Sequence, residues 1–414
     1  ILGTNSIKDT GYDVANSCRF NSGSSDYLHK TPSGAGTSAD LFTFSMWIKR
    51  GIISSSDRIV LFYAQSDAQN FDRISFTDAD VLEWKGVRSD SQAFNLTTSQ
   101  VFRDISSWYH LHFIWDSADS TADNRMRIYV NGTQVTAFGT RANPSSGLDA
   151  IIGSAQKHSV GSTGSSGTYY DGYMAEVVYL DGQELTPDGN TGEFDEDSGI
   201  WKPIDVSGLT FGTNGFYLDF EDSGNLGNDA NGGTDLTEVN LAATDQSTDT
   251  CTNNFAVLNP LIHGANYTFS EGNLQFAQSA TNWDTAYSSI AVTKGKWYME
   301  FKGKVGAYYD IGVTDVVDPT NNLTVNSGCV AYKSNGEFAR AGAVGDGLPS
   351  TVTDPASNTY TADDIMGIAI DVDNEAVYFS KNGTYEVNSD PTSGASKTGA
   401  VTLPNSGSTY FFAF

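Results

Sequence analysis

The chain has 414 residues, enough for two or three domains, and no run of about 18 apolar residues from which a transmembrane helix could form. It carries 50 acidic against 23 basic side chains, a net charge of −27, which argues against nucleic acid and anionic membrane surfaces as partners. Short aromatic and β-branched runs alternate with glycine-rich turns, and long helical periodicity is absent, so the sequence predicts an all-β protein of sandwich type.

The first ten residues, ILGTNSIKDT, contain neither a methionine nor the apolar core of a signal peptide. We therefore expect the chain to be a processed or partial piece of a longer product. Its three cysteines are far apart in the sequence and form no Cys-x-x-Cys pair. They predict buried free thiols rather than a disulfide framework or a structural zinc site, at Cys18, Cys251 and Cys329.

Residues 108–116, WYHLHFIWD, alternate between two faces as a half-buried strand does. The larger apolar side chains share the buried face, whereas His110 and His112 share the other, which we expect to point outward. Two histidines on one face are candidate metal ligands, but no third ligand is identifiable among the three remaining histidines. The sequence therefore favours an outward structural pair over a metal site.

Two Asn-Gly dipeptides, Asn131-Gly132 and Asn382-Gly383, lie between alternating runs. A type I′ turn needs a positive φ at both central residues, and Asn-Gly tolerates this well. Each dipeptide therefore predicts a tight β-hairpin.

Residues 187–262 are rich in Asp, Gly, Asn and Thr, with only short strand-like runs among them. We interpret this segment as an irregular bridge, packed by its aromatic residues, between two β-sandwich domains at 1–186 and 263–414. Two acidic turns in the bridge are rich in the oxygen ligands that calcium prefers, but neither has the spacing of an EF-hand. We interpret them as solvated turns; if calcium is bound, the candidate ligands are Asp195, Asp197, Asp222 and Asp229, and no other cofactor is expected.

The first domain resembles a laminin-G-type, concanavalin A-like jelly roll. Five segments carry the resemblance in the right order and at the right spacing, from about residue 14 to 186. They are SCRFNSGSSDYLHK (17–30), FTFSMWIKR (42–50), WYHLHFIWD (108–116), RIYVNGTQV (127–135) and YYDGYMAEVVYLDGQELT (169–186).

The last domain resembles a SPRY domain. Four segments match successive strands of that family, and STYFFAF (408–414) looks like its penultimate strand. The family usually continues with one more strand, so we expect an unpaired edge near 408–414 that a neighbouring chain or further sequence covers. The four segments are GKWYMEFKGK (295–304), YYDIGVTD (308–315), GCVAYKSNGEF (328–338) and DDIMGIAIDVDNEAVYFSKNG (363–383).

Three carboxylates at spacing two, Asp371, Asp373 and Glu375, form the strongest catalytic candidate in the sequence. On one strand they would share a face about 6.5–7 Å apart, a separation that glycosidases use. Glycosidases of the laminarinase type, which share the jelly roll, carry a Glu-x-Asp-x-x-Glu row, but Ala369 stands where the leading Glu would be. A turn around Asn374 is also needed for the following strand to pair back. We therefore expect no catalytic residue here, and a buried face made by Ile368, Ile370 and Val372.

The jelly roll, the acidic bridge and the stretch NLAATDQSTDTCTNNFAVLNPL together look like structural and tail-fibre proteins of marine bacteriophages. This resemblance implies a non-enzymatic virion protein: a tail fibre, an adhesin or a capsid-surface decoration. The expected partners are other virion proteins, further copies of the chain, and a host-surface glycan or protein. We expect host contacts on loops such as 159–168 and 340–350, although no individual ligand-binding residue is identifiable. Two alternatives remain open, namely a secreted carbohydrate-active enzyme with a binding module and a cell-surface adhesin.

Overall fold

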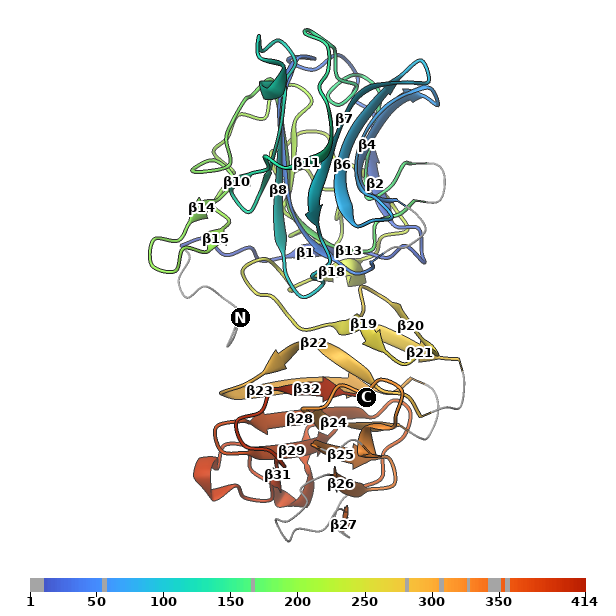
Figure 1. Cartoon of the computed structure of the whole chain (residues 1–414), viewed down its shortest axis with the longest axis vertical. Coiled ribbons are helices and arrows are strands. Elements are labelled where there is room, and N and C mark those ends of the chain that lie inside the picture. The colour runs from blue at the N-terminus through green and yellow to red at the C-terminus, as the bar shows by residue number, and fades with distance from the viewer. Residues whose placement is uncertain are drawn as a thin grey trace. The chain divides into compact units, whose positions relative to one another are not determined.

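The computed structural model of the chain in Figure 1 is all-β, which confirms the predicted fold class. The structure describes residues 11–53, 58–164, 168–279, 283–304, 309–325, 328–341, 351–353 and 358–414. They form two compact units, each with its own core. The N-terminal unit runs to Phe255 and includes Ser270–Gly272, and the C-terminal unit comprises Ala256–Phe269 and Asn273–Phe414. Within the described ranges, no helix is long and apolar enough to cross a membrane.

The N-terminal unit is a sandwich of two antiparallel sheets, each with eight strands in the described part of the chain. The first sheet has the order β10 (Thr133–Gln134), β9 (Met126–Val130), β8 (Tyr109–Asp116), β3 (Leu41–Arg50), β13 (Gly172–Asp181), β1 (Ser17–Phe20) and β18 (Gln246–Ser247), with β16 (Phe216–Leu218) also paired to β13. The second has the order β11 (Phe138–Ala142), β7 (Ser91–Val101), β6 (Val81–Arg88), β5 (Asn70–Phe76), β4 (Ile59–Asp67), β12 (Lys157–Val160), β2 (Tyr27–Lys30) and β17 (Thr237–Val239).

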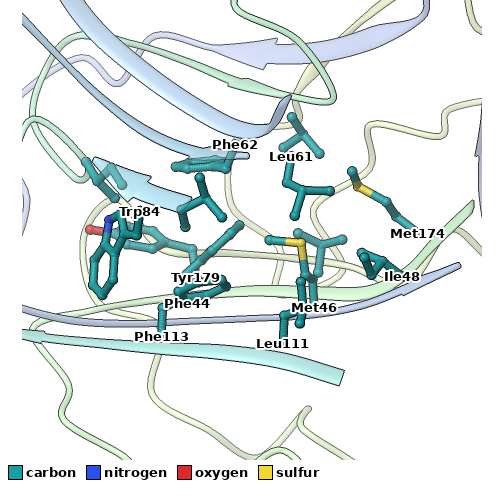
Figure 2. Packing of buried hydrophobic residues seen from close by; sticks show 14 of the residues in the cluster. Phe44, Met46, Ile48, Leu61, Phe62, Trp84, Leu111, Phe113, Met174 and Tyr179 are labelled. Carbon is teal, nitrogen blue, oxygen red and sulfur yellow. The ribbon is translucent and has the colours of Figure 1, made fainter. Parts of the chain in front are cut away.

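Aromatic side chains from both sheets fill the space between them. Figure 2 shows Phe62, from the second sheet, above Phe44 from the first, and their ring centroids are 4.4 Å apart. Trp84 meets the edge of Phe113 at 5.5 Å. All four side chains are fully buried, and each such burial stabilises the fold by about 1.5–3 kcal/mol. This core fixes which side chains of the second sheet point away from it.

Strand β13 carries a β-bulge centred on Glu176, which has a φ of 49°. Before the bulge one edge of the strand pairs with β1, and after it the same edge pairs with β16. The buried Glu176 carboxylate accepts hydrogen bonds from the hydroxyls of Tyr217 at 2.8 Å and Tyr12 at 3.0 Å. Burial raises the pKa of Glu176 to about 7, although both hydroxyl groups act in the opposite direction.

The segment predicted to bridge two domains belongs to the N-terminal unit as far as Phe255. Its strands β16, β17 and β18 extend both sheets. The buried Lys49 ammonium anchors its end by donating to Asp249 Oδ2 and Asn254 Oδ1, both at 2.7 Å, and to the Phe255 carbonyl at 2.6 Å. The predicted boundary at 186 therefore differs from the structure, because paired strands and a buried charge hold the following 70 or so residues on the sandwich.

The C-terminal unit is a second antiparallel sandwich. One sheet has the order β19 (Leu258–His263), β22 (Ala286–Val292), β32 (Tyr410–Ala413), β24 (Asp310–Thr314), β25 (Cys329–Lys333), β26 (Glu337–Ala341) and β27 (Thr351–Thr353). The other has the order β23 (Lys296–Lys302), β28 (Ile365–Asp371), β29 (Ala376–Lys381) and β30 (Thr384–Tyr385), with β31 (Val401–Thr402) also paired to β29. A small hairpin joins β20 (Tyr267–Ser270) to β21 (Gln275–Gln278).

Strand β32 does not form an open edge, so that prediction was wrong. It lies inside its sheet, between β22 and β24, and Ala413 is paired with Tyr287 on one side and Gly312 on the other. Both edges of the strand are therefore occupied by this chain, and the predicted opening for a neighbouring chain is closed.

Both Asn-Gly hairpins are confirmed. Asn131 and Gly132 join β9 to β10 with φ values of 48° and 75°, and Asn382 and Gly383 join β29 to β30 with 49° and 80°.

The cysteines are free, as expected; Cys18 and Cys329 are buried, whereas Cys251 is half-buried.

Candidate functional site

The acidic row at the end of β28 is divided by a turn, as the sequence predicted. Asp371 is buried and accepts hydrogen bonds from the backbone N–H of Asn374 at 3.0 Å and from its side-chain amide at 2.9 Å. Asp373 is exposed, and Glu375 has a φ of 52° in the turn. The three carboxylates therefore share no strand face. The predicted buried face is confirmed at Ile368, Ile370 and Val372.

His110 and His112 do not point outward, contrary to the prediction. Both are fully buried beneath the segment that includes β14 (Glu193–Phe194) and β15 (Trp201–Lys202). The indole N–H of Trp201 donates to Nδ1 of His110 at 3.0 Å, and Nε2 of His112 donates to the Leu185 carbonyl at 2.8 Å. The other two ring nitrogens bond to a serine and a threonine hydroxyl. All four nitrogens are occupied and burial lowers both pKa values, that of His112 to about 4, so the pair is a neutral structural element.

The four candidate calcium ligands have separate local roles. Asp195 accepts from a serine in its own turn and lies 3.6 Å from the Lys202 ammonium, and Asp197 is exposed. Asp222 caps a neighbouring backbone N–H, whereas Asp229 is buried and accepts from the backbone N–H of residue 217. Within the described ranges, no group of three His, Cys, Asp or Glu residues is arranged to hold a metal ion. Calcium in this segment stays a prediction.

A row of outward side chains crosses the second sheet of the N-terminal unit. Its register places in line the residues of five neighbouring strands, β6, β5, β4, β12 and β2. Of these, β4 and β6 are seen as curved strands in Figure 1. Residues opposite each other in antiparallel strands share a face, and the neighbours of these residues along each strand point into the core. We call this row the Tyr63 face; its members are Lys85, Arg73, Tyr63, Ser159 and His29.

Aromatic rings lie in the row and beside it. Tyr63 is 7% exposed, its ring centroid is 5.5 Å from that of Phe71, and its hydroxyl donates to the Gln65 side chain at 2.9 Å. Near the His29 end of the row, Tyr27 lies 6.2 Å from Tyr169, centroid to centroid. The Lys157 ammonium is 5.6 Å from the centre of the Tyr27 ring. The middle of the row and its His29 end therefore carry aromatic rings with polar tips.

The charged centre of the face is Glu83, the neighbour of Ser75 across β5 and β6. Its Oε2 lies 2.8 Å from the guanidinium of Arg73 and 3.2 Å from that of Arg58. Burial raises the pKa of Glu83, but the hydrogen bond from Arg73 and the charges of Arg73, Arg58 and Lys85 outweigh it and hold the pKa below its ordinary value. The carboxylate is therefore charged at neutral pH.

Two polar atoms on this face are buried without a hydrogen-bond partner in the described part of the chain: Ser75 Oγ and Arg73 Nε. A buried polar group without a partner costs about 1–3 kcal/mol, so these two atoms are a local energetic cost of the face. Both lie next to the Glu83 carboxylate, where the aromatic and charged parts of the face meet.

This arrangement suits binding better than hydrolysis. Glycosidases use two carboxyl groups about 5–9.5 Å apart, one of which carries a proton. Glu83 is the carboxylate that contacts this row, and its two arginine partners keep it ionised. Three basic side chains, Arg58, Arg73 and Lys85, surround it in a chain whose net charge is −27.

The sequence interpretation did not identify this face. Alternation in residues 59–67, 70–76 and 81–88 could have indicated which side chains point outward. It could not bring residues 29 and 159 beside residue 63, because those strand pairings join distant parts of the chain. Of the loops predicted to contact a host, residues 165–167 and 342–350 lie outside the described residues.

Comparison with known proteins agrees with the architecture of the N-terminal unit. Residues 22–188 match the family model of the concanavalin A-like lectin/glucanases superfamily. The chain contains a laminin-G-like jelly roll. The Tyr63 face lies within the matched residues. No curated protein matches the chain.

Three solved structures with similarity to the chain are remote in sequence. A native heptameric SAP-like pentraxin from Limulus polyphemus is 16% identical, with 42% of this chain and 80% of that chain covered and a TM-score of 0.32. A putative carbohydrate binding protein from Bacteroides ovatus is also 16% identical, with 55% of this chain and 58% of that chain covered and a TM-score of 0.37. The SPRY domain of human HERC1 is 14% identical, with 32% of this chain and 74% of that chain covered and a TM-score of 0.23.

Proposed function

We propose that the N-terminal unit is a non-catalytic glycan-binding module that takes an anionic polysaccharide on the Tyr63 face. The observation that carries this proposal is the gathering of three basic side chains, Arg58, Arg73 and Lys85, around Glu83 in an otherwise acidic chain. Arginine binds carboxylate or sulfate oxygens with two parallel N–H groups, and the tyrosines beside it offer rings on which sugar C–H groups pack. The match of residues 22–188 to a family of lectins and glucanases supports a carbohydrate ligand.

We further propose that the protein acts on the surface of a virion, as a tail fibre, an adhesin or a capsid-surface decoration that contacts host glycans. What supports this role is the resemblance of the jelly roll and its acidic continuation to phage structural proteins. Particles present many copies, so a weak glycan site on each copy suffices for attachment. A chain that neither associates with itself at high concentration nor occurs in purified particles would contradict this role.

The binding proposal is tested with the full chain and two polysaccharides, alginate as the anionic probe and laminarin as the neutral one. We expect alginate oligomers to bind the Tyr63 face and to bind less tightly as salt is raised, because the contacts are ionic. Replacing Arg73→Met should weaken alginate binding about 10–100-fold, since a hydrogen bond to a charged group contributes about 1.5–3 kcal/mol. Lys85→Ala is a second variant that leaves the Arg73–Glu83 ion pair in place.

Arg141→Ala is the matched control, because Arg141 lies in β11 of the same sheet and pairs with Asp123 away from the row. It should bind alginate as the unchanged chain does. Equal binding by all three variants, or tighter binding in high salt, would refute the proposal. Neither polysaccharide should release sugar; release that is lost in Asp371→Asn or Glu83→Gln would instead support an enzyme.

A further inference from the structure

The C-terminal unit has a hollow on the outer face of its five-stranded sheet. Tyr298 on β23, Ala369 on β28 and Tyr378 on β29 lie directly opposite one another across three adjacent strands. Their neighbours along each strand are partly or fully buried in the core of the unit, so this row points outward. The hollow has a volume of about 250 Å³, and Tyr385 and Pro391 complete its wall.

The hollow exists because a small residue lies between two large ones. Ala369 forms the floor, and its methyl group leaves open the space between the two tyrosines. Tyr378 is 1% exposed and its hydroxyl is 3.4 Å from that of Ser393, whereas Tyr298 is 51% exposed. Gly367 lets the Tyr298 ring lie across the sheet, since a Cβ there would come within 2.6 Å of the tyrosine hydroxyl. The hollow therefore has one fixed wall and one wall open to solvent.

One end of the hollow is polar. Asp371 lies opposite Lys296, and the ammonium is 3.4 Å from Oδ2 of the carboxylate. The Asp371 side chain is 2% exposed and is oriented by Asn374, whereas the Lys296 side chain is 56% exposed. A lysine ammonium has three N–H donors and a carboxylate has about four acceptor positions, so this pair can both donate to and accept from a ligand.

We propose that this hollow binds one ring of a neutral hexose or N-acetylhexosamine. Adjacent sugar hydroxyls both donate and accept hydrogen bonds, which matches the Lys296–Asp371 pair, and the C–H face of the ring matches the exposed ring of Tyr298. An anionic ligand gains little here, because the nearest cation is already neutralised by Asp371. An apolar side chain would cover the ion pair without hydrogen-bonding to it. The volume lies below the usual 300–1,000 Å³ range for ligand pockets, which favours a single ring.

This site is independent of the Tyr63 face. Its residues belong to the C-terminal unit, outside the family match at residues 22–188 and apart from the basic side chains of the first sandwich. The two sites also differ in the ligand charge that they favour. Either proposal can therefore fail while the other holds.

The test uses the full chain and the methyl glycosides of glucose, galactose, mannose and N-acetylglucosamine, followed by saturation-transfer NMR and titration. At least one glycoside should bind to the unchanged protein. Ala369→Leu fills the floor and should weaken that binding more than tenfold. Tyr298→Ala removes the exposed wall and should weaken it about three- to tenfold; because Tyr298 is half exposed, this variant decides the matter if Ala369→Leu fails to fold.

Lys302→Ala is the matched control, since Lys302 lies outward on the same strand but outside the hollow. It should bind as the unchanged chain does, and so should Arg73→Met, which alters only the N-terminal face. The proposal is overturned if none of the four glycosides binds, or if Tyr298→Ala binds as tightly as the unchanged chain. Preferential binding of methyl glucuronide, an anionic probe, at the same residues would also overturn it.

Discussion

The Tyr63 face and the outer face of the C-terminal sheet have opposite arrangements of large and small side chains. In the Tyr63 face, the large Tyr63 lies between Arg73 and the small Ser159, which is 1% exposed, and charged side chains lie nearby. In the second, the small Ala369 stands between two tyrosines and leaves a hollow. The same antiparallel geometry thus yields a filled, basic face or an open, nearly neutral one. The size of the residue at the middle of the row decides which of the two results.

The prediction with the largest expected effect tests whether the two units that carry these faces are stabilised independently. Lys49→Met removes the cation of a buried ion pair and leaves the Asp249 carboxylate buried without it. Such a change costs about 3–5 kcal/mol of unfolding free energy, and every partner of the Lys49 ammonium lies in the N-terminal unit. Denaturant unfolding with limited proteolysis should show destabilisation confined to residues up to 255.

Lys302→Met is the control for this prediction, because Lys302 and its partner Asp363 are exposed. Their side chains are 53% and 81% exposed, so losing this pair should cost less than about 0.5 kcal/mol. Equal destabilisation of both units by Lys49→Met would show that the two units are not stabilised independently.

The next prediction distinguishes the two units by the pH dependence of their stability. The folded-state pKa of Glu176 is about 7, above its ordinary value of 4.5. Between these values the folded state holds a proton that the unfolded state has lost, so the stability of the N-terminal unit falls as pH rises from about 4.5 to 7. The full span is about 3 kcal/mol, at 1.36 kcal/mol per pKa unit. Glu176→Gln should lower this slope, most clearly between about pH 6 and 7, in melting temperatures measured from pH 4 to 8.

The C-terminal unit should show a slope of the same sign at lower pH, between about 4 and 6, because burial raises the pKa of Asp310 from 3.8 to about 6. That slope should persist in Glu176→Gln. An unchanged slope in the N-terminal unit of this variant would mean that another group titrates there, and Asp26, whose pKa burial raises to about 6, is the first candidate.

The smallest effect compares the tyrosine hydroxyls of the two faces. Tyr63→Phe removes the hydrogen bond to Gln65 from a side chain that is 7% exposed and should cost about 1 kcal/mol. Tyr298→Phe removes the bond to Glu300 from a half-exposed side chain and should cost less than about 0.5 kcal/mol. Equal costs in chemical denaturation would mean that exposure does not distinguish the two faces.

Local patterns predicted local structure well. The Asn-Gly hairpins and the turn after Asp371 depend on the φ values and side-chain bonds of adjacent residues, which are readable from the sequence. The outward placement of His110 failed because alternation only says that a side chain points away from one core. It cannot say that Trp201, some 90 residues later, covers the other side.

Long-range pairing explains the remaining differences. The position of β32 inside its sheet and the boundary near 255 both depend on partners that composition does not specify. The candidate sites are rows across several strands, so they need the register of every pair. The sequence singled out Asp371, which lines the hollow, but it could not place Tyr298 and Ala369 beside each other.

The late strands of the N-terminal unit have a consequence for how the protein is made. Ser17 in β1 bonds to the Asp249 backbone, 232 residues further along the chain, and β18 covers the edge of β1. The ribosome synthesises about 5–20 residues per second, so β1 waits at least about ten seconds for this partner. Until then the nascent sandwich exposes sheet edges that invite pairing with other chains. A fragment that ends at residue 186 would keep those edges open permanently and should aggregate. The segment up to residue 255 thus protects the sheet edges of its own domain from pairing with other chains.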